Sequence, residues 1–326
     1  MELLAITQLK QDTTSFYRAA GVFRNLRKNF PGLNVTLLDQ NEVMLSWANL
    51  VRYDCIMIQR PYKEWSVPLI QMANRLKIPV WVDYDDNLLE VPRGMAKIYD
   101  IYNDETTRKT IAYCIQLADV VTVSTDDLKE YLLPINENIV VVRNAIDLDL
   151  TGPKSEKERS GGIGWRGSET HLIDLMVYQE QIRQAFAETK CDWYFLGFDN
   201  MFLSGERYKY IKPNDIFIYL NTLHQLNLSC LHTPLADNIF NRCKSNIAAI
   251  EGTWAGAVCI VPEWKEWDIP GMLKYNDVSS YLNALMAVAN NEVDVEKMNK
   301  EAWAFICDEL SIDKQNKKRI KILKNL

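Results

Sequence analysis

Short apolar runs rich in β-branched residues alternate with helix-patterned stretches along the first half of the chain. This alternation is typical of a parallel sheet, because each crossover between parallel strands is usually made by a helix. Helical patterns lie at residues 15–28, 65–76 and 106–117. The apolar runs are LLAI, VTLL, CIMI, VWVD, VVTVS and IVVVRN. The sequence therefore predicts a doubly wound, Rossmann-like α/β domain over residues 1–150.

The same alternation resumes after a polar segment at residues 151–162, TGPKSEKERSGG, which has no apolar periodicity and is typical of an exposed linker. A second Rossmann-like domain is expected over residues 163–304. Its expected strands are GIGW, WYFLG, IFIY, LNLSCL and VCIVP. Residues from 279 onward are expected to be helical, and the closing segment KQNKKRIKILKNL, residues 314–326, is basic and amphipathic, as in a solvated helix.

Composition is that of an ordinary soluble globular protein, with 48% hydrophobic and 25% charged residues, and argues against several classes of protein. The chain of 326 residues is long enough for two domains, and a net charge of -6 argues against coating nucleic acid by charge alone. Seven cysteines form no CxxC pair, which favours reduced cysteines and a cytoplasmic location. No segment approaches the roughly 20 apolar residues of a membrane span. Oligomeric state is left open.

Residues 234–262 contain the sharpest candidate site. A helix is expected to begin at Lys244, which would place Glu251 two turns later on the same face, roughly 10 Å along the axis. The Lys244 ammonium and the free N–H groups near Ser245 suit phosphate oxygens. The Glu251 carboxylate can accept hydrogen bonds from ribose hydroxyls. The alternative is that both are solvated charges on an amphipathic helix.

Polar residues follow most of the expected strands of the first domain. Ligands of open α/β sheets bind beyond the carboxyl ends of the strands, so these residues are expected to line one rim of a cleft. Each alone is also explained as a helix cap or a surface charge. The candidates are Tyr17, Arg18, Arg60, Asp85, Asp86, Ser124 and Asn144.

The segment GIGWRGSETH follows the linker and combines glycines with a cation before a helical stretch. Gly164 and Gly167 would permit a tight turn whose N–H groups approach phosphate, with Arg166 and Ser168 as further contacts. The segment matches neither a Walker A sequence nor GxGxxG spacing. A plain β-turn is the alternative.

Together these segments resemble family four glycosyltransferases and their relatives, including phage and bacterial members, most closely the KS-type branch. The donor-site signature is carried by Asp237, Asn238, Phe240, Asn241, Lys244, Ser245, Glu251 and Gly256. Further matches in chain order are residues 16–18, Arg60, residues 83–86, Ser124, Thr125, Asn144, Asp147 and the GIGWRGSETH turn. The resemblance implies the GT-B fold, with two Rossmann-like domains facing a cleft and the last helix, about 305–326, crossing back to the first domain.

The resemblance also implies the chemistry. It predicts transfer of a sugar from a nucleotide-diphosphate sugar to a hydroxyl acceptor, with retention of configuration. Lys244 and Arg166 would neutralise the departing diphosphate and Glu251 would hold the ribose. Asp237, as a catalytic residue, and Asn238 would contact the sugar hydroxyls, and Asn241 would bind the donor, although Cys243 stands where the commonest form of the signature has an acidic residue. The candidates on the first-domain rim would shape the acceptor side.

No cofactor or essential metal is expected. The DxD patterns at 83–85 and 147–149 belong to the other glycosyltransferase fold when they bind metal, and the three histidines form no recognisable ligand set. Glycans, lipid carriers, proteins and hydroxymethylated DNA bases remain open as acceptors. A second alternative is a nucleotide-sugar-binding GT-B subunit without catalytic activity.

Overall fold

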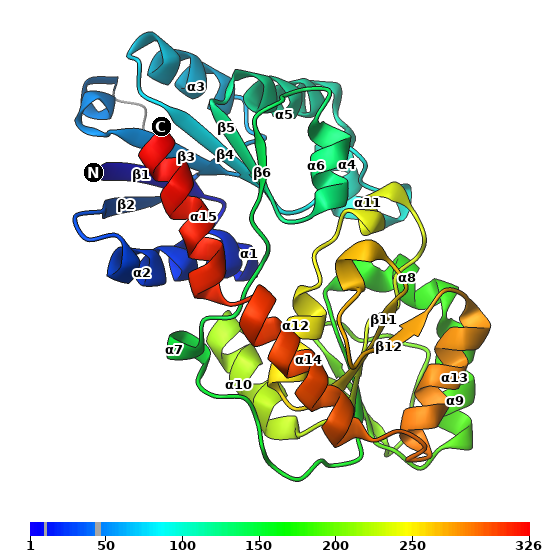
Figure 1. Cartoon of the computed structure of the whole chain (residues 1–326). Coiled ribbons are helices and arrows are strands. Elements are labelled where there is room, and N and C mark those ends of the chain that lie inside the picture. Colours follow the sequence, from blue (N-terminus) through cyan, green and yellow to red (C-terminus); the bar gives the residue numbers. More distant parts are fainter. Residues whose placement is uncertain (10–11, 43–46) are drawn as a thin grey trace.

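The computed structural model describes residues 1–9, 12–42 and 47–326. Two six-stranded parallel sheets, each flanked by helices, form two domains that face one another (Figure 1). The first sheet has the order β2-β1-β3-β4-β5-β6. Its strands are β1 (Glu2–Thr7), β2 (Asn34–Asp39), β3 (Cys55–Gln59), β4 (Val80–Tyr84), β5 (Val120–Val123) and β6 (Ile139–Val141).

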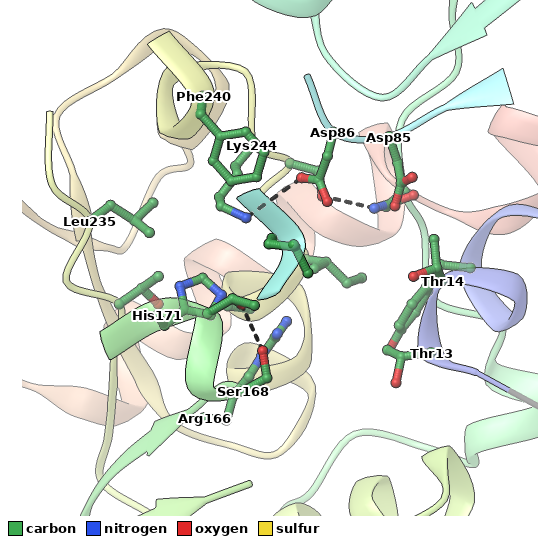
Figure 2. A pocket seen from close by; sticks show the side chains of 18 of the residues that line it. Thr13, Thr14, Asp85, Asp86, Arg166, Ser168, His171, Leu235, Phe240 and Lys244 are labelled. Carbon is green, nitrogen blue, oxygen red and sulfur yellow. Dashed lines mark hydrogen bonds and ion pairs between the residues drawn. The ribbon is translucent and has the colours of Figure 1, made fainter. Parts of the chain in front are cut away.

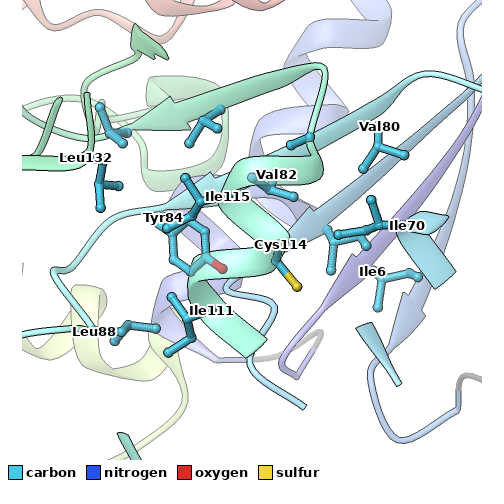
Figure 3. Packing of buried hydrophobic residues seen from close by; sticks show 14 of the residues in the cluster. Ile6, Ile70, Val80, Val82, Tyr84, Leu88, Ile111, Cys114, Ile115 and Leu132 are labelled. Carbon is cyan, nitrogen blue, oxygen red and sulfur yellow. The ribbon is translucent and has the colours of Figure 1, made fainter. Parts of the chain in front are cut away.

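Helices of the first domain connect these strands. They are α1 (Thr13–Arg18), α2 (Ala20–Asn29), α3 (Ser66–Arg75), α4 (Ala96–Asn103), α5 (Glu105–Leu117), α6 (Asp126–Leu132) and α7 (Leu148–Thr151), with 3-10 turns η1 (Trp47–Arg52) and η2 (Arg93–Met95). Figure 3 shows Ile111, Cys114 and Ile115 of α5 beside Val80 and Val82 of β4 in the core. Strands buried on both faces explain why these segments read as continuous apolar runs.

The second sheet has the order β12-β11-β10-β7-β8-β9 and is also parallel throughout. Its strands are β7 (Ile163–Arg166), β8 (Trp193–Leu196), β9 (Tyr208–Ile211), β10 (Cys230–His232), β11 (Val258–Pro262) and β12 (Leu273–Tyr275). Its helices are α8 (Leu172–Val177), α9 (Gln179–Glu188), α10 (Ile216–Leu226), α11 (Ile239–Arg242), α12 (Ile247–Trp254), α13 (Val278–Ala289) and α14 (Val295–Glu309), with 3-10 turns η3 (Glu169–His171) and η4 (Lys265–Trp267).

One expected strand is wrong. The run IFIY opens α10, because the Asp215 side chain accepts hydrogen bonds from the N–H groups of Phe217 and Ile218 and so caps a helix. Two strands that the sequence did not indicate, β9 and β12, lie at the two edges of the second sheet.

The last helix, α15 (Ile312–Asn325), crosses back and packs on the first domain (Figure 1). Ile322 and Leu323 are buried there with Phe23 and Leu26 of α2. The crossing predicted for the end of the chain is therefore confirmed. Among the described residues, no helix combines the length and apolarity needed to traverse a lipid bilayer.

Candidate active site

A cavity of about 410 Å³ lies between the two domains, where the carboxyl ends of both sheets meet (Figure 2). Arg60 follows β3, Asp85 and Asp86 follow β4, and Arg166 ends β7. In Figure 2, Asp85, Thr13 and Thr14 of the first domain lie on one side, and Lys244, His171 and Arg166 of the second domain lie on the other. The strand ends of both domains thus deliver polar side chains to one cleft.

The first-domain wall is built on Arg60. Its guanidinium pairs with Asp85 through Nε and with Asp86 through a 2.5 Å contact from Nη2 to Oδ2. Arg60 has a backbone φ of 48°, in the left-handed region that non-glycine residues occupy at a cost. Burial raises the pKa of Asp85 against the opposing effect of Arg60. Burial also acts to raise the pKa of Asp86, but Lys244 and Arg60 overcome it and lower this pKa to about 2.

Lys244 reaches this wall from the second domain. Its Nζ lies 3.6 Å from Asp86 Oδ1 and 4.5 Å from the centre of the Phe240 ring. The predicted helix start is wrong: α12 begins at Ile247, and Lys244 lies in the turn after α11. Lys244 and Glu251 therefore do not share a helical face. Ser245 is nevertheless in the cavity wall, where its hydroxyl accepts a 2.8 Å hydrogen bond from Asn144 of the first domain.

Glu251 lies at the centre of a buried cluster. Its side chain has no exposed surface, and its Oε2 lies 3.0 Å from Arg166 Nε. The hydroxyls of Tyr17 and Tyr219 donate to its two oxygens at 2.6 and 2.7 Å. Burial, together with the Glu251 charge, raises the pKa of both tyrosines. These contacts engage both carboxylate oxygens of Glu251 with groups of the protein.

A second cavity of about 480 Å³ adjoins the first and is enclosed by the second domain and Thr13. Gly167 and Gly197 lie at the ends of neighbouring strands, and Gly197 has a φ of 101°. A Cβ on Gly197 would lie 2.4 Å from the Gly167 carbonyl oxygen, so this close approach of two turns requires glycine. Thr13, Arg166, Ser168 and His171 line both cavities, so the two cavities are neighbours that share part of their walls.

Two first-domain candidates lie behind the cavity wall and do not line either cavity. Arg18 is 1% exposed and its guanidinium binds Asp83 at 2.6 Å, with further hydrogen bonds to the Val142 carbonyl and the Asn144 side chain. The Ser124 hydroxyl donates to the Asp85 carbonyl. Their expected place on the rim is therefore corrected: both are buried supports of the residues that reach the cavity.

Four second-domain candidates also stand apart from both cavities. Gly164 lies within β7, where a Cβ would meet the Leu228 side chain at 2.3 Å, so this glycine serves packing. The Asn238 side chain caps α11 by accepting from the Asn241 N–H, and Asn241 is buried against Asp174. Asp237 is 66% exposed and pairs with Arg242. The geometry places none of these four in contact with a ligand in either cavity.

Sequence reasoning set His171 aside, although it lines both cavities. Its Nδ1 lies 2.8 Å from Asp174 Oδ2, and Asp174 is 1% exposed. The other carboxylate oxygen of Asp174 accepts hydrogen bonds from the Ala236 N–H and the Asn241 side chain. The available signal was a histidine and an aspartate three residues apart, directly after the glycine turn.

The two DxD patterns serve ion pairs and caps. Asp83 is held by Arg18 and by the Thr122 hydroxyl, Asp85 by Arg60, and Asp149 by Lys28. Asp147 caps α7. Within residues 1–9, 12–42 and 47–326, no three His, Cys, Asp or Glu side chains gather in a way that would hold a metal ion.

Comparison with known proteins identifies the fold. No protein-family model and no curated protein matches the chain. A glycosyltransferase structure from Rickettsia africae aligns with a TM-score of 0.69 at 11% identity, covering 99% of this chain and 98% of that chain. HepE from Anabaena in complex with UDP aligns with a TM-score of 0.65 at 12% identity over 100% of both chains. An alpha-glucosyltransferase in complex with UDP and a 13-mer DNA containing a central A:G mismatch aligns with a TM-score of 0.65 at 11% identity over 99% of both chains.

At these identities the likeness shows the fold, and the expected GT-B architecture is confirmed: two Rossmann-like domains, facing strand ends and a returning last helix. The resemblance to family four glycosyltransferases, and to the KS-type branch among them, stays a prediction.

Proposed function

We propose that this protein is a glycosyltransferase that moves a sugar from a nucleotide-diphosphate sugar to a hydroxyl acceptor. The observation that carries the proposal is a pair of neighbouring cavities with shared walls, at the point where the strand ends of the two domains face one another. One cavity lies within the second domain and the other opens between the domains. A donor that spans both would place its sugar against the first-domain wall, where an acceptor can approach.

The nucleoside would occupy the cavity beside Gly167, Gly197 and Tyr219, and the diphosphate would lie at the junction of the two cavities. Arg166, Ser168 and Lys244 supply charge and hydrogen-bond donors there. The first-turn residues Ile247 and Ala248 of α12 also line the cavity, so the positive end of that helix adds to the phosphate site. Glu251 belongs to the lining of the nucleoside cavity and would accept a hydrogen bond from a ribose hydroxyl.

The proposed reaction retains the configuration of the sugar. The acceptor hydroxyl attacks the anomeric carbon on the face from which the diphosphate departs, and the carbon–oxygen bond to the diphosphate breaks. The departing diphosphate oxygen takes the acceptor proton. Asp86 suits this scheme as a binding group because a carboxyl whose pKa is lowered to about 2 is a poor general base near neutral pH. Lys244 and Arg166 would stabilise the developing charge, so the scheme requires no metal.

The first-domain wall, which the acceptor would contact, favours a neutral molecule that carries hydroxyl groups. Among the described first-domain residues that line the cavity, Arg60 is the one arginine, and it is already paired with Asp85 and Asp86. The carboxylates and the nearby Thr13 and Thr14 hydroxyls can hydrogen-bond an acceptor hydroxyl. Nucleic-acid binding draws instead on cations that neutralise phosphates. Hydroxymethylated DNA remains the alternative, and a mass gain on such DNA after incubation with nucleotide sugars would establish it.

A thermal-shift panel of UDP, GDP, ADP, CMP and dTDP sugars tests the donor site. A donor at 100 times its dissociation constant should stabilise the protein by about 2.7 kcal/mol. Lys244→Ala should lose most of the shift, whereas Lys274→Ala, at an exposed ion pair with Asp268, should keep it. The absence of a shift with every sugar would remove the donor assignment. Donor hydrolysis or transfer then separates an enzyme from a nucleotide-sugar-binding subunit.

A further inference from the structure

His171 is held so that only one ring nitrogen is available to a ligand. The Asp174 carboxylate takes hydrogen bonds from three donors, one of which is His171 Nδ1–H. This contact fixes the tautomer, because the carboxylate can only accept. The His171 side chain is 20% exposed to solvent, and it lines both cavities. Within the part of the chain that the structure describes, Nε2 has no hydrogen-bond partner.

The charges around the junction of the cavities cancel without a ligand. Arg60, Arg166 and Lys244 are cationic, and each is paired with Asp85, Asp86 or Glu251. Among the described residues at this junction, three cations therefore face three carboxylates. A sugar nucleotide adds two negative phosphate charges. His171 is the cavity-lining group at this junction that gains positive charge by taking up one proton near neutral pH.

We propose that His171 is a donor-binding residue whose imidazolium Nε2–H donates to the diphosphate, so that the protein takes up a proton when it binds a nucleotide sugar. This inference rests on the proposed function and adds a pH-dependent contact to it. The proton comes from solvent and resides on Nε2 while the donor is bound, and no covalent bond changes.

The neighbours of His171 agree with a neutral ring in the empty cleft. Burial lowers its pKa, Asp174 acts to raise it, and Lys244 and Arg166 lower it further. Asp86 faces the ring from the other wall, and Glu169 lies on the same 3-10 turn. A bound diphosphate offsets the Lys244 and Arg166 charges and presents oxyanions, which favours the imidazolium. The pKa of His171 is thus expected to rise on binding, and donor affinity to fall as pH rises between the two values.

Titration calorimetry with UDP-glucose measures the coupling directly. A nucleotide sugar is the right probe, because its diphosphate lacks the terminal phosphate that titrates near neutral pH in UDP. The same titration at pH 7 in PIPES and in Tris, which differ in ionisation enthalpy, gives the number of protons exchanged. We expect uptake of a substantial fraction of one proton, and a dissociation constant that rises by up to about tenfold per pH unit. Equal apparent enthalpies in both buffers would overturn the proposal.

Two variants separate the hydrogen bond that residue 171 donates to the diphosphate from the positive charge of the imidazolium. His171→Gln places an amide near Nε2 and can donate a hydrogen bond without titrating, whereas His171→Asn reaches only the Asp174 side. We expect both to abolish proton uptake, and His171→Gln to bind more tightly than His171→Asn. His224→Asn is the control, because His224 contacts the Pro153 carbonyl and Trp254 outside both cavities. Proton uptake that persists in both His171 variants would contradict the inference.

Failure of the proposed function and failure of the role proposed for His171 give different results. If neither UDP-glucose nor any other sugar of the thermal-shift panel binds, the donor site and this inference both fall. If a nucleotide sugar binds with no proton uptake and no dependence on residue 171, the proposed function stands and the role of His171 is rejected.

Discussion

The two walls of the cleft differ in how their charged groups are satisfied. On the first-domain side, Asp85 and Asp86 in the wall and Asp83 behind it are held by arginines of their own domain, which fixes their positions. On the second-domain wall, Lys244 pairs with a carboxylate of the opposite domain, and His171 leaves one nitrogen open. The first wall is thus a preformed surface, whereas the second has groups that a ligand can recruit.

The largest expected effect tests the preformed wall. Arg18→Met leaves Asp83 buried without its cation and should destabilise the protein by about 3–5 kcal/mol, measured by urea unfolding. Arg18→Met combined with Asp83→Asn should recover much of the loss. Because Arg18 lies behind the wall, nucleotide-sugar affinity should change little at a temperature where the variant is folded. A large loss of affinity with unchanged stability would place Arg18 in the binding site.

Lys244→Ala tests the second-domain wall, whose groups are proposed to bind the donor. It should lower transferase turnover by about 10²–10³-fold, because Lys244 would neutralise charge that develops on the departing diphosphate. Stability should change far less than in Arg18→Met, since removal of Lys244 leaves Asp86 paired with Arg60. Initial rates with saturating donor provide the measurement, and Lys274→Ala is the control. Full turnover in Lys244→Ala would remove the lysine from the mechanism.

Glu266 is a buried second-domain carboxylate whose cation, Arg143, comes from the first domain. Burial raises the pKa of Glu266 to about 7 against the opposing effect of Arg143. This pKa lies above the value in the unfolded chain, so the folded protein favours the protonated form of Glu266. The contribution of Glu266 to the free energy of unfolding is therefore complete below about pH 4.5 and is lost as the pH rises toward 7. Glu266→Gln should therefore gain about 2–3 kcal/mol over the native protein at pH 8 and nothing at pH 4.5. Urea unfolding at the two pH values measures the gain, and equal gains would contradict the assignment.

The two tyrosines on Glu251 give a matched pair across the domain boundary. Tyr17→Phe and Tyr219→Phe each remove a hydrogen bond to a buried carboxylate, and each should cost about 1.5–3 kcal/mol in thermal unfolding. Tyr17 belongs to the first domain, so its loss also frees one acceptor site of Glu251 without altering the nucleoside cavity. We expect Tyr17→Phe to keep or improve nucleotide-sugar affinity, and Tyr219→Phe, in the cavity wall, to weaken it. The reverse order would contradict the ribose contact proposed for Glu251.

The smallest effect is expected at Asp237, which the family resemblance placed on the donor. Its exposed pair with Arg242 should contribute under about 1 kcal/mol, and Asp237→Ala should leave turnover within about twofold. Arg242→Ala is the matched control for the ion pair. A large turnover loss in Asp237→Ala alone would restore the role that the resemblance gave it.

Sequence patterns predicted the sheets better than the side-chain contacts. Buried parallel strands such as β3 and β4 are visible because both faces are apolar, whereas the edge strand β9 has two exposed residues in its middle and no buried one. IFIY has strand-like composition, and only the cap at Asp215 decides for helix. Strand-end residues were found correctly as a class, but which of them reach the cavity depends on partners far away in sequence, such as Asp83 for Arg18.

The return of α15 to the first domain has a consequence for biosynthesis. α2 ends at residue 29 and α15 begins at residue 312, yet Phe23 and Leu26 share one core with Ile322 and Leu323. While the chain emerges from the ribosome, the first domain must wait for nearly the whole second domain before this apolar face is covered. A nascent chain stalled after α14 should consequently recruit chaperones through its N-terminal half, although that half was made first.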